Sequence, residues 1–145
     1  EVFLPDLLDQ VLRLIAGDLR YTTQKFYVGV LDRQWIIVDQ VMAIQVLMNL
    51  MIFCLKSLAS EDSRLSLDIV IADNNMLSIK IGIKHFINGS FSNEDDMKDQ
   101  LELSIVNQIV MNQNGQFDIF CEHQLASFHI MLPIKKLSVA TSSSS

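Results

Sequence analysis

The sequence predicts an α+β fold: a two-layer α/β sandwich in which three helices cover one face of a mixed, mostly antiparallel sheet of about five strands, with one further short edge strand. Segments with helical periodicity alternate along the chain with short runs rich in β-branched and aromatic residues. Half of the 145 residues are apolar and only 19% are charged. A chain of this size and composition can form a substantial core without disulfides.

The first part of the chain predicts one helix and two strands. Pro5 suits the first turn of a helix, and Gly17 ends the apolar face that follows, which consists of Leu7, Leu8, Val11, Leu12 and Ile15. Lys25–Val30 and Trp35–Val38 are rich in residues that favour strands. The four residues between these two runs predict a turn.

The middle of the chain predicts the core helix and a hairpin. From Asp39 or Gln40 to Leu58, apolar residues cover most of the helix circumference, so this helix should be buried on more than one side. Leu65–Ile71 and Leu77–Ile83 each alternate apolar and polar residues, as strands with one covered face do. Asn74 and Asn75 lie between them and predict the tip of the hairpin.

A third helix is expected from Met97 to about Asn112, after a loop rich in turn-forming residues at 88–96. Its apolar face is expected to contain Met97, Leu101, Ile105, Val106, Ile109 and Val110. Asn114 and Gly115 follow the helix and tolerate the positive φ that often ends one.

A second hairpin is expected to close the domain. Its strands are Phe117–Cys121 and Ser127–Leu132, turning about Gln124, and Pro133 ends the second strand. We therefore expect one domain at residues 1–138 and a linker or tail at 139–145, with no signal peptide at the N-terminus.

Composition excludes several classes of function. The net charge of −6, from 17 acidic and 11 basic residues, disfavours a nucleic-acid surface. Cys54 and Cys121 lack the spacing of zinc ligands, so we expect reduced thiols and no metal site. Val41–Leu55 would span about 22 Å as a helix, short of the roughly 30 Å hydrocarbon layer, so we expect no membrane contact.

Three stretches together resemble the ATP-binding domain of bacterial sensor histidine kinases, over nearly the whole chain. The opening VFLPDLLDQVLRLIA resembles the segment that begins this domain, and the closing SIVNQIVMNQNGQFDIFCEHQLASFHIMLPI resembles its last helix and hairpin. Between them, WIIVDQVMAIQVLMNLMIFCLKS resembles the family's asparagine motif. The match lies in Asp39, Gln45, Val46, Leu47, Asn49, Leu50 and Lys56.

The same resemblance implies that the nucleotide-binding residues have been replaced. In the family, the second asparagine of the NLxxNA motif holds magnesium, and this chain has Phe53 there. The aspartate that recognises adenine corresponds to Ile83, and the first glycine of the same DxGxG motif corresponds to His85. Lys98, Gln100 and Glu102 stand where the family has the glycines that approach the phosphates.

Asn49 and Lys56 are the polar residues of this site that remain. We therefore expect a vestigial cleft at Asn49, Phe53, Lys56, Ile83 and His85, with Phe53 as a residue that could fill it, and with no catalytic residue, no metal and no cofactor. A cleft left empty could accept another ligand. None of His85, His123 and His129 begins a helix of the kind that carries the family's phosphoacceptor.

These expectations define a non-catalytic domain of a histidine-kinase-like protein that regulates two-component or phosphorelay signalling through protein contacts. The partners expected are the parent's own dimerisation helices, a receiver domain or another kinase, in a homodimeric parent. The domain would lie in the cytoplasm, alone or as part of a membrane-anchored sensor. Two alternatives stay open: the vestigial domain of a phosphotransfer protein with its histidine hairpin upstream, and an active kinase domain with diverged motifs.

Overall fold

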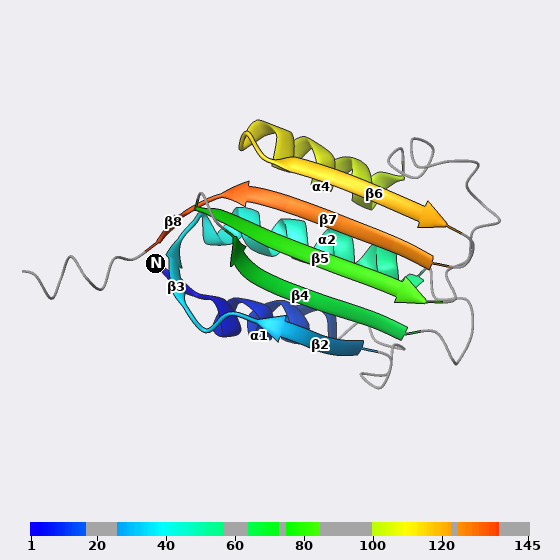
Figure 1. The fold of residues 1–145 in the computed structure, drawn as a ribbon, viewed down its shortest axis with the longest axis horizontal. Coiled ribbons are helices and arrows are strands. Elements are labelled where there is room, and N and C mark those ends of the chain that lie inside the picture. The colour runs from blue at the N-terminus through cyan, green and yellow to red at the C-terminus, as the bar shows by residue number, and fades with distance from the viewer. Residues whose placement is uncertain (17–25, 57–63, 73–74, 85–99, 123–124, 137–145) are drawn as a thin grey trace, which may run out of the picture.

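The structure is a computed structural model that describes residues 1–16, 26–56, 64–72, 75–84, 100–122 and 125–136. The helices α1 (Leu4–Ala16), α2 (Gln40–Lys56) and α4 (Leu101–Asn112) form one layer, with α2 in contact with both others. They lie on one side of a large sheet (Figure 1). The predicted two-layer sandwich is confirmed.

The large sheet has five strands in the order β2-β4-β5-β7-β6. Their bounds are Phe26–Leu31 for β2, Arg64–Ala72 for β4, Met76–Lys84 for β5, Gln116–Glu122 for β6 and Leu125–Pro133 for β7. β2 runs parallel to β4, and every other neighbouring pair is antiparallel. Both predicted hairpins form, β4 with β5 and β6 with β7, and Pro133 ends β7 as expected.

A second, small sheet joins the two ends of the domain. It has the order β1-β3-β8, where β1 is Val2–Phe3, β3 is Trp35–Ile37 and β8 is Lys135–Lys136. The strand predicted at 35–38 therefore exists, but it lies outside the large sheet. β1 and β8 were not predicted, because a two-residue strand carries no readable periodicity.

The third helix differs from the prediction in its start and in its buried face. Gln100 is extended (φ −65°, ψ 145°), so a helix continuous from Met97 is wrong, and residues 97–99 lie outside the described part of the chain. The buried residues of α4 are Leu103, which was not expected on the apolar face, and Val106 and Val110, which were. Leu101, expected to be buried, is 72% exposed. Because apolar residues occur all around this helix, its periodicity alone does not select the face.

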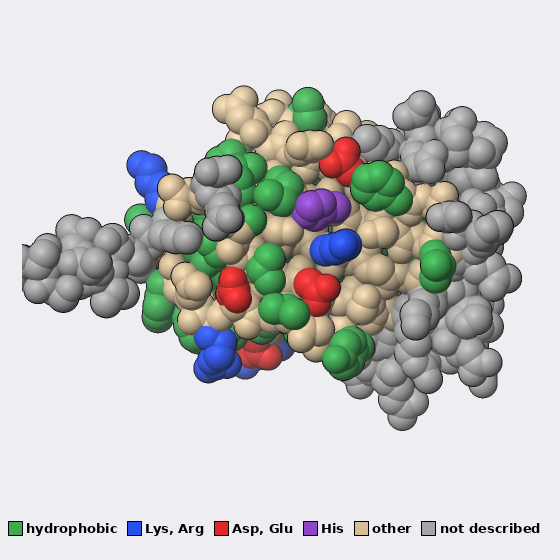
Figure 2. Space-filling model, viewed as in Figure 1, with side chains coloured by type: hydrophobic (Ala, Val, Ile, Leu, Met, Phe, Trp, Pro, Cys, Tyr) green, Lys and Arg blue, Asp and Glu red, His purple; other side chains and the backbone are tan. Residues whose placement is uncertain are grey.

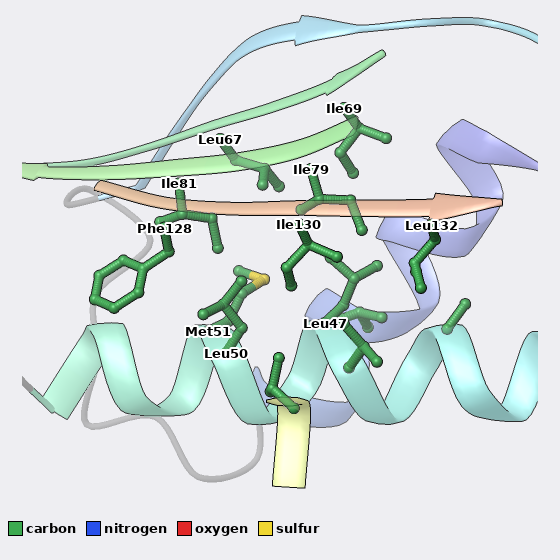
Figure 3. Packing of buried hydrophobic residues seen from close by; sticks show 14 of the residues in the cluster. Leu47, Leu50, Met51, Leu67, Ile69, Ile79, Ile81, Phe128, Ile130 and Leu132 are labelled. Carbon is green, nitrogen blue, oxygen red and sulfur yellow. The ribbon is translucent and has the colours of Figure 1, made fainter. Parts of the chain in front are cut away.

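The core fills the space between α2 and the large sheet. Inward-facing residues alternate along the strands, and side chains of α2 point toward those of the strands, as Figure 3 shows for Leu47, Leu50 and Met51. The strand residues that Figure 3 labels opposite them are Leu67, Ile69, Ile79, Ile81, Phe128, Ile130 and Leu132. Val2, Ile36 and Ile134 from the small sheet belong to the same buried cluster.

The two predicted turns use asparagine at positive φ. Asn75 has φ 56° at the tip of the first hairpin, and Asn114 has φ 60° after α4. Asn74 lies outside the described residues. Gly115 does not have positive φ; it is needed because a Cβ there would lie 2.4 Å from the carbonyl oxygen of Met131.

None of the helices in the described part of the chain combines the length and apolar character that a membrane crossing requires.

Candidate functional site

The expected cleft residues of α2 share one face of that helix. Asn49, Phe53 and Lys56 are spaced by four and three residues, which places them in line along the helix. Asn49 is half-buried, and its Nδ2 donates a hydrogen bond of 2.7 Å to the carbonyl oxygen of Gln45 in the same helix. The amide of Asn49 is thus bonded to its own helix backbone. The side chain of Lys56 lies outside the described part.

Phe53 occupies the core and not a polar site. Its side chain is 4% exposed, and its ring meets that of Phe128 on β7 edge to face, with centroids 5.9 Å apart and planes at 72°. A phenyl ring offers no oxygen ligand, so this position supplies nothing that could bind a hard cation.

Ile83 lies on β5 and faces the helices. It pairs in register with Leu65 on β4 and with Ala126 on β7, and its side chain is 1% exposed. The three residues form a continuous apolar row on the inner face of the sheet. The position that resembles the adenine-binding aspartate therefore has neither a carboxylate nor a polar neighbour in this row.

The start of α4 carries negative charge. Glu102 lies in its first turn, where a carboxylate interacts favourably with the positive end of the helix dipole. An anionic ligand such as a phosphate would meet this carboxylate at the same helix end. Gln100 at the N-cap makes no side-chain capping bond. Lys98, the third residue expected here, lies outside the described residues.

Of the five expected cleft residues, Asn49, Phe53 and Lys56 lie along one face of α2, and Phe53 and Ile83 both belong to the buried core. His85 is outside the described part. Within the described residues, no group of three or more His, Cys, Asp or Glu side chains is placed to hold a metal ion. The arrangement seen at Phe53 and Ile83 is suited to packing.

The two cysteines, Cys54 and Cys121, are not in disulfides. Burial raises the pKa of the Cys54 thiol well above its ordinary value, so this thiol stays protonated at neutral pH.

Two features near the site were missed from sequence. Phe128, the ring partner of Phe53, lies 75 positions further along the chain, and only the alternation of β7 indicated that it faces inward. His129, its neighbour, faces the opposite side of the sheet, and its Nε2 lies 2.9 Å from Oγ of Ser78 on β5. No sequence spacing links these two residues; the strand register does.

The layered architecture places the protein among α/β sandwiches with helices on one face of a mixed sheet. Solved structures identify the fold more closely. The chain is similar to the histidine kinase AdeS of Acinetobacter baumannii, with TM-score 0.69 and 17% identity, and to the mycobacterial sensor histidine kinase MprB, with TM-score 0.68 and 18% identity. It also resembles the catalytic domain of the histidine kinase ThkA, with TM-score 0.61 and 15% identity.

The similarity extends over nearly the whole chain. It covers 92%, 94% and 91% of this chain, and 66%, 99% and 94% of the AdeS, MprB and ThkA chains respectively. No family model matches the sequence, and no curated protein matches it. The protein therefore has the fold of histidine kinase catalytic domains, and at these identities the fold is what the similarity establishes.

Proposed function

We propose that this chain is a degenerate ATP-binding domain of a bacterial histidine-kinase-like protein, and that it acts in two-component or phosphorelay signalling as a non-catalytic protein-interaction module. Its partners would be the dimerisation helices of its own homodimeric parent, a receiver domain or another kinase, in the cytoplasm. The observation that carries the proposal is Phe53, which stands where the resembled motif has its metal-binding asparagine and is 4% exposed against Phe128.

Two further positions support the loss of nucleotide binding. Ile83, at the place of the adenine-binding aspartate, is enclosed by Leu65 and Ala126. Glu102 puts a carboxylate at the helix end where the resembled motif has a glycine. Metal binding, base recognition and phosphate binding are separate contributions, and each is affected by a different substitution.

Asn49, one of the two polar residues of the site that remain, supports the same proposal. Asn49 donates its amide to the backbone of its own helix, so its side chain already has a partner without any ligand. An active kinase with rearranged ligands would need polar groups directed at a nucleotide. Phe53 and Ile83 supply none.

Calorimetric titration tests the proposal. The purified chain is titrated with ATP and with AMPPNP, each with and without magnesium, and ShkA, which was crystallised in complex with AMPPNP, serves as the positive control. We expect no saturable heat for this chain at ligand concentrations up to about 1 mM, where a 1 μM site would be saturated. Stoichiometric magnesium-dependent binding would refute the non-catalytic assignment and favour the diverged active kinase.

A further inference from the structure

The large sheet presents one face that no helix covers in the described part of the chain (Figure 2). Figure 2 shows a histidine and a basic side chain near the centre of this face, with acidic side chains on either side and apolar side chains both beside them and toward the margins. The strand register assigns these side chains to rows that cross the sheet. Two of the rows carry the inference.

We call the first the charged row. It consists of Asp118 on β6, His129 on β7, Lys80 on β5 and Asp68 on β4, each opposite the next in register. Its charges are therefore negative, neutral, positive and negative across four strands when His129 is neutral.

We call the second the stepped row, because large side chains stand at its ends and small ones between them. It consists of Phe120, Ser127, Gly82, Ser66 and Tyr27 on β6, β7, β5, β4 and β2. The two aromatic residues are 63% and 64% exposed. Neighbouring strands lie about 4.8 Å apart, so the small residues form a depression roughly 10 Å wide between their outer members.

The two charged side chains at the centre of this face, Asp68 and Lys80, can each form a further ion pair. One oxygen of Asp68, Oδ1, accepts a hydrogen bond of 2.8 Å from the backbone nitrogen of Val30. Lys80 is exposed and forms no ion pair within the described part of the chain, although Asp68 lies opposite it. A carboxylate of another molecule, placed above Lys80, could therefore form an ion pair with it.

Two copies of this face can pack against each other, related by a two-fold axis parallel to the strands. The place at which this axis crosses the sheet decides which residues of the two copies face each other. An axis midway between β4 and β5 sets β4 against the partner's β5, and β2 against its β7. Lys80 of each copy then faces Asp68 of the other. In the stepped row, Tyr27 of each copy faces Ser127 of the other, and Ser66 faces Gly82.

Other axes fit less well. An axis on β5 sets Lys80 against Lys80 and Tyr27 against Phe120, and an axis on β4 sets Asp68 against Asp68. An axis between β5 and β7 sets Asp68 against Asp118. An axis on β7 pairs Lys80 with Asp118, but it overlaps three strands instead of four. The axis between β4 and β5 thus combines opposite charges, large against small side chains and an overlap of four strands.

We propose that the open sheet face binds a second copy of this chain about a two-fold axis between β4 and β5, with reciprocal Lys80–Asp68 pairs and with Tyr27 packed over Ser127 of the partner. Sheets that pack face to face keep their strands within about 30° of each other, so the central rows stay opposed. A face four strands wide is at or below the usual size of about 800 Å² per partner. We expect a weak dimer, whose dissociation constant the sedimentation experiment below measures.

Sedimentation equilibrium tests the charge pairing. The chain is examined from about 1 μM to 1 mM, and Lys80→Asp is compared with Lys135→Asp, which makes the same charge change at an exposed position of the small sheet. We expect Lys80→Asp to raise the dissociation constant at least tenfold and Lys135→Asp to change it less than twofold. A chain that stays monomeric throughout, or a dimer equally stable in both variants, would overturn the proposal.

Chemical crosslinking tests the register under conditions that need no loss of fold. Chains carrying Tyr27→Cys are mixed with chains carrying Ser127→Cys, both in a Cys121→Ser background, and treated with a thiol-specific bifunctional reagent that spans about 10 Å. That span is chosen because sheets packed face to face lie about 10 Å apart, whereas two Cα atoms more than about 7 Å apart do not form a disulfide. In the proposed dimer, the two copies of position 27, or of position 127, are offset by three further strand spacings, about 14 Å, and lie beyond the reach of the reagent. We expect the mixed covalent dimer to form and neither variant to link to itself.

A matched pair distinguishes the competing axis. Gly82→Cys and Phe120→Cys would face each other only if the axis lay on β7. Efficient crosslinking of this pair, without crosslinking of Tyr27→Cys to Ser127→Cys, would overturn the proposed arrangement. Failure of both pairs to crosslink at concentrations where the chain is dimeric would show that the dimer uses another surface.

Discussion

Phe53 is a core residue at the position where the resembled motif has an asparagine. Its ring is 4% exposed and meets Phe128 edge to face. Removing a buried phenylalanine side chain typically costs about 3–5 kcal/mol. We expect Phe53→Ala to lower the free energy of unfolding by about that amount, measured as a shift of the urea midpoint with an unchanged slope.

Phe120→Ala is the matched control, because it removes the same ring from a side chain that is 63% exposed. We expect it to change stability by less than about 0.5 kcal/mol. Phe53→Asn adds a functional check, since it restores the residue of the resembled motif. It should destabilise the fold and still not bind magnesium-ATP; binding by this variant would mean that the rest of the site is intact.

At the residue scale, the sequence indicates which side chains are absent from the resembled motifs, but it does not indicate which side chains are in contact. The absence of a carboxylate at Ile83 and of an amide at Phe53 follows from the printed sequence once the motifs are aligned. That the ring of Phe53 meets Phe128 does not follow, because this contact depends on how far α2 lies along β7. Such an offset is set by packing of the whole layer.

The turn after α4 shows how an element's end can depend on close packing. Asn114 takes the positive φ, while Gly115 lies so close to β7 that a Cβ would be 2.4 Å from the carbonyl oxygen of Met131 and 3.0 Å from Cγ1 of Val110. A backbone oxygen cannot move aside without shifting the strand. We expect Gly115→Ala to destabilise the protein by about 1–3 kcal/mol, as overpacking usually does.

Gly82→Ala makes the same chemical change with a different neighbour. A Cβ at Gly82 would meet the Ser66 hydroxyl oxygen at 3.1 Å, and a hydroxyl can rotate away. We expect a change within about 0.5 kcal/mol, with both variants measured by urea unfolding at low protein concentration. Equal losses for the two alanine variants would show that backbone crowding at Met131 is not the cause.

At the element scale, the strands of the two hairpins were readable because one face is covered and the other is not. α4 was harder to predict. The predicted face included Val106 and Val110, which are buried, but it also included Leu101, which is exposed, and it omitted the buried Leu103. The contacts of α4 with α2 and β6 decide which side of the helix is covered. Its start was predicted too early because the acidic residues Glu94, Asp95 and Asp96 are typical of a first helical turn, whereas α4 begins only after the extended Gln100.

At the scale of the whole molecule, the small sheet is the feature that the sequence did not predict. β1 and β8 have two residues each and come from opposite ends of the described chain, so only the folded structure brings them to β3. The sheet is nevertheless part of the main core, because Val2, Ile36 and Ile134 are buried in the same cluster as α2. Two-residue strands owe their stability to that burial and to the chain ends they join.

This shared core predicts a single cooperative unfolding transition, and Trp35 makes it measurable. Trp35 is the only tryptophan in the chain; it lies in β3, half exposed, with its ring 5.3 Å from that of Phe3. Its fluorescence therefore reports on the small sheet, while far-ultraviolet circular dichroism reports on all helices and strands. Because Ile36 beside it is fully buried in the common core, we expect both signals to change at the same urea concentration.

Ile36→Ala sharpens this prediction by removing a side chain that the small sheet contributes to the common core. Loss of a buried isoleucine side chain costs about 2–5 kcal/mol, and in one cooperative unit that loss lowers both midpoints together. Ile37 is the next residue along β3 and is 43% exposed. We expect Ile37→Ala to lower the fluorescence midpoint and the dichroism midpoint much less than Ile36→Ala does. If the fluorescence midpoint of Ile36→Ala fell while the dichroism midpoint stayed at its original urea concentration, the small sheet would be an independent unit, and the core that links both ends of the domain to α2 would not be cooperative.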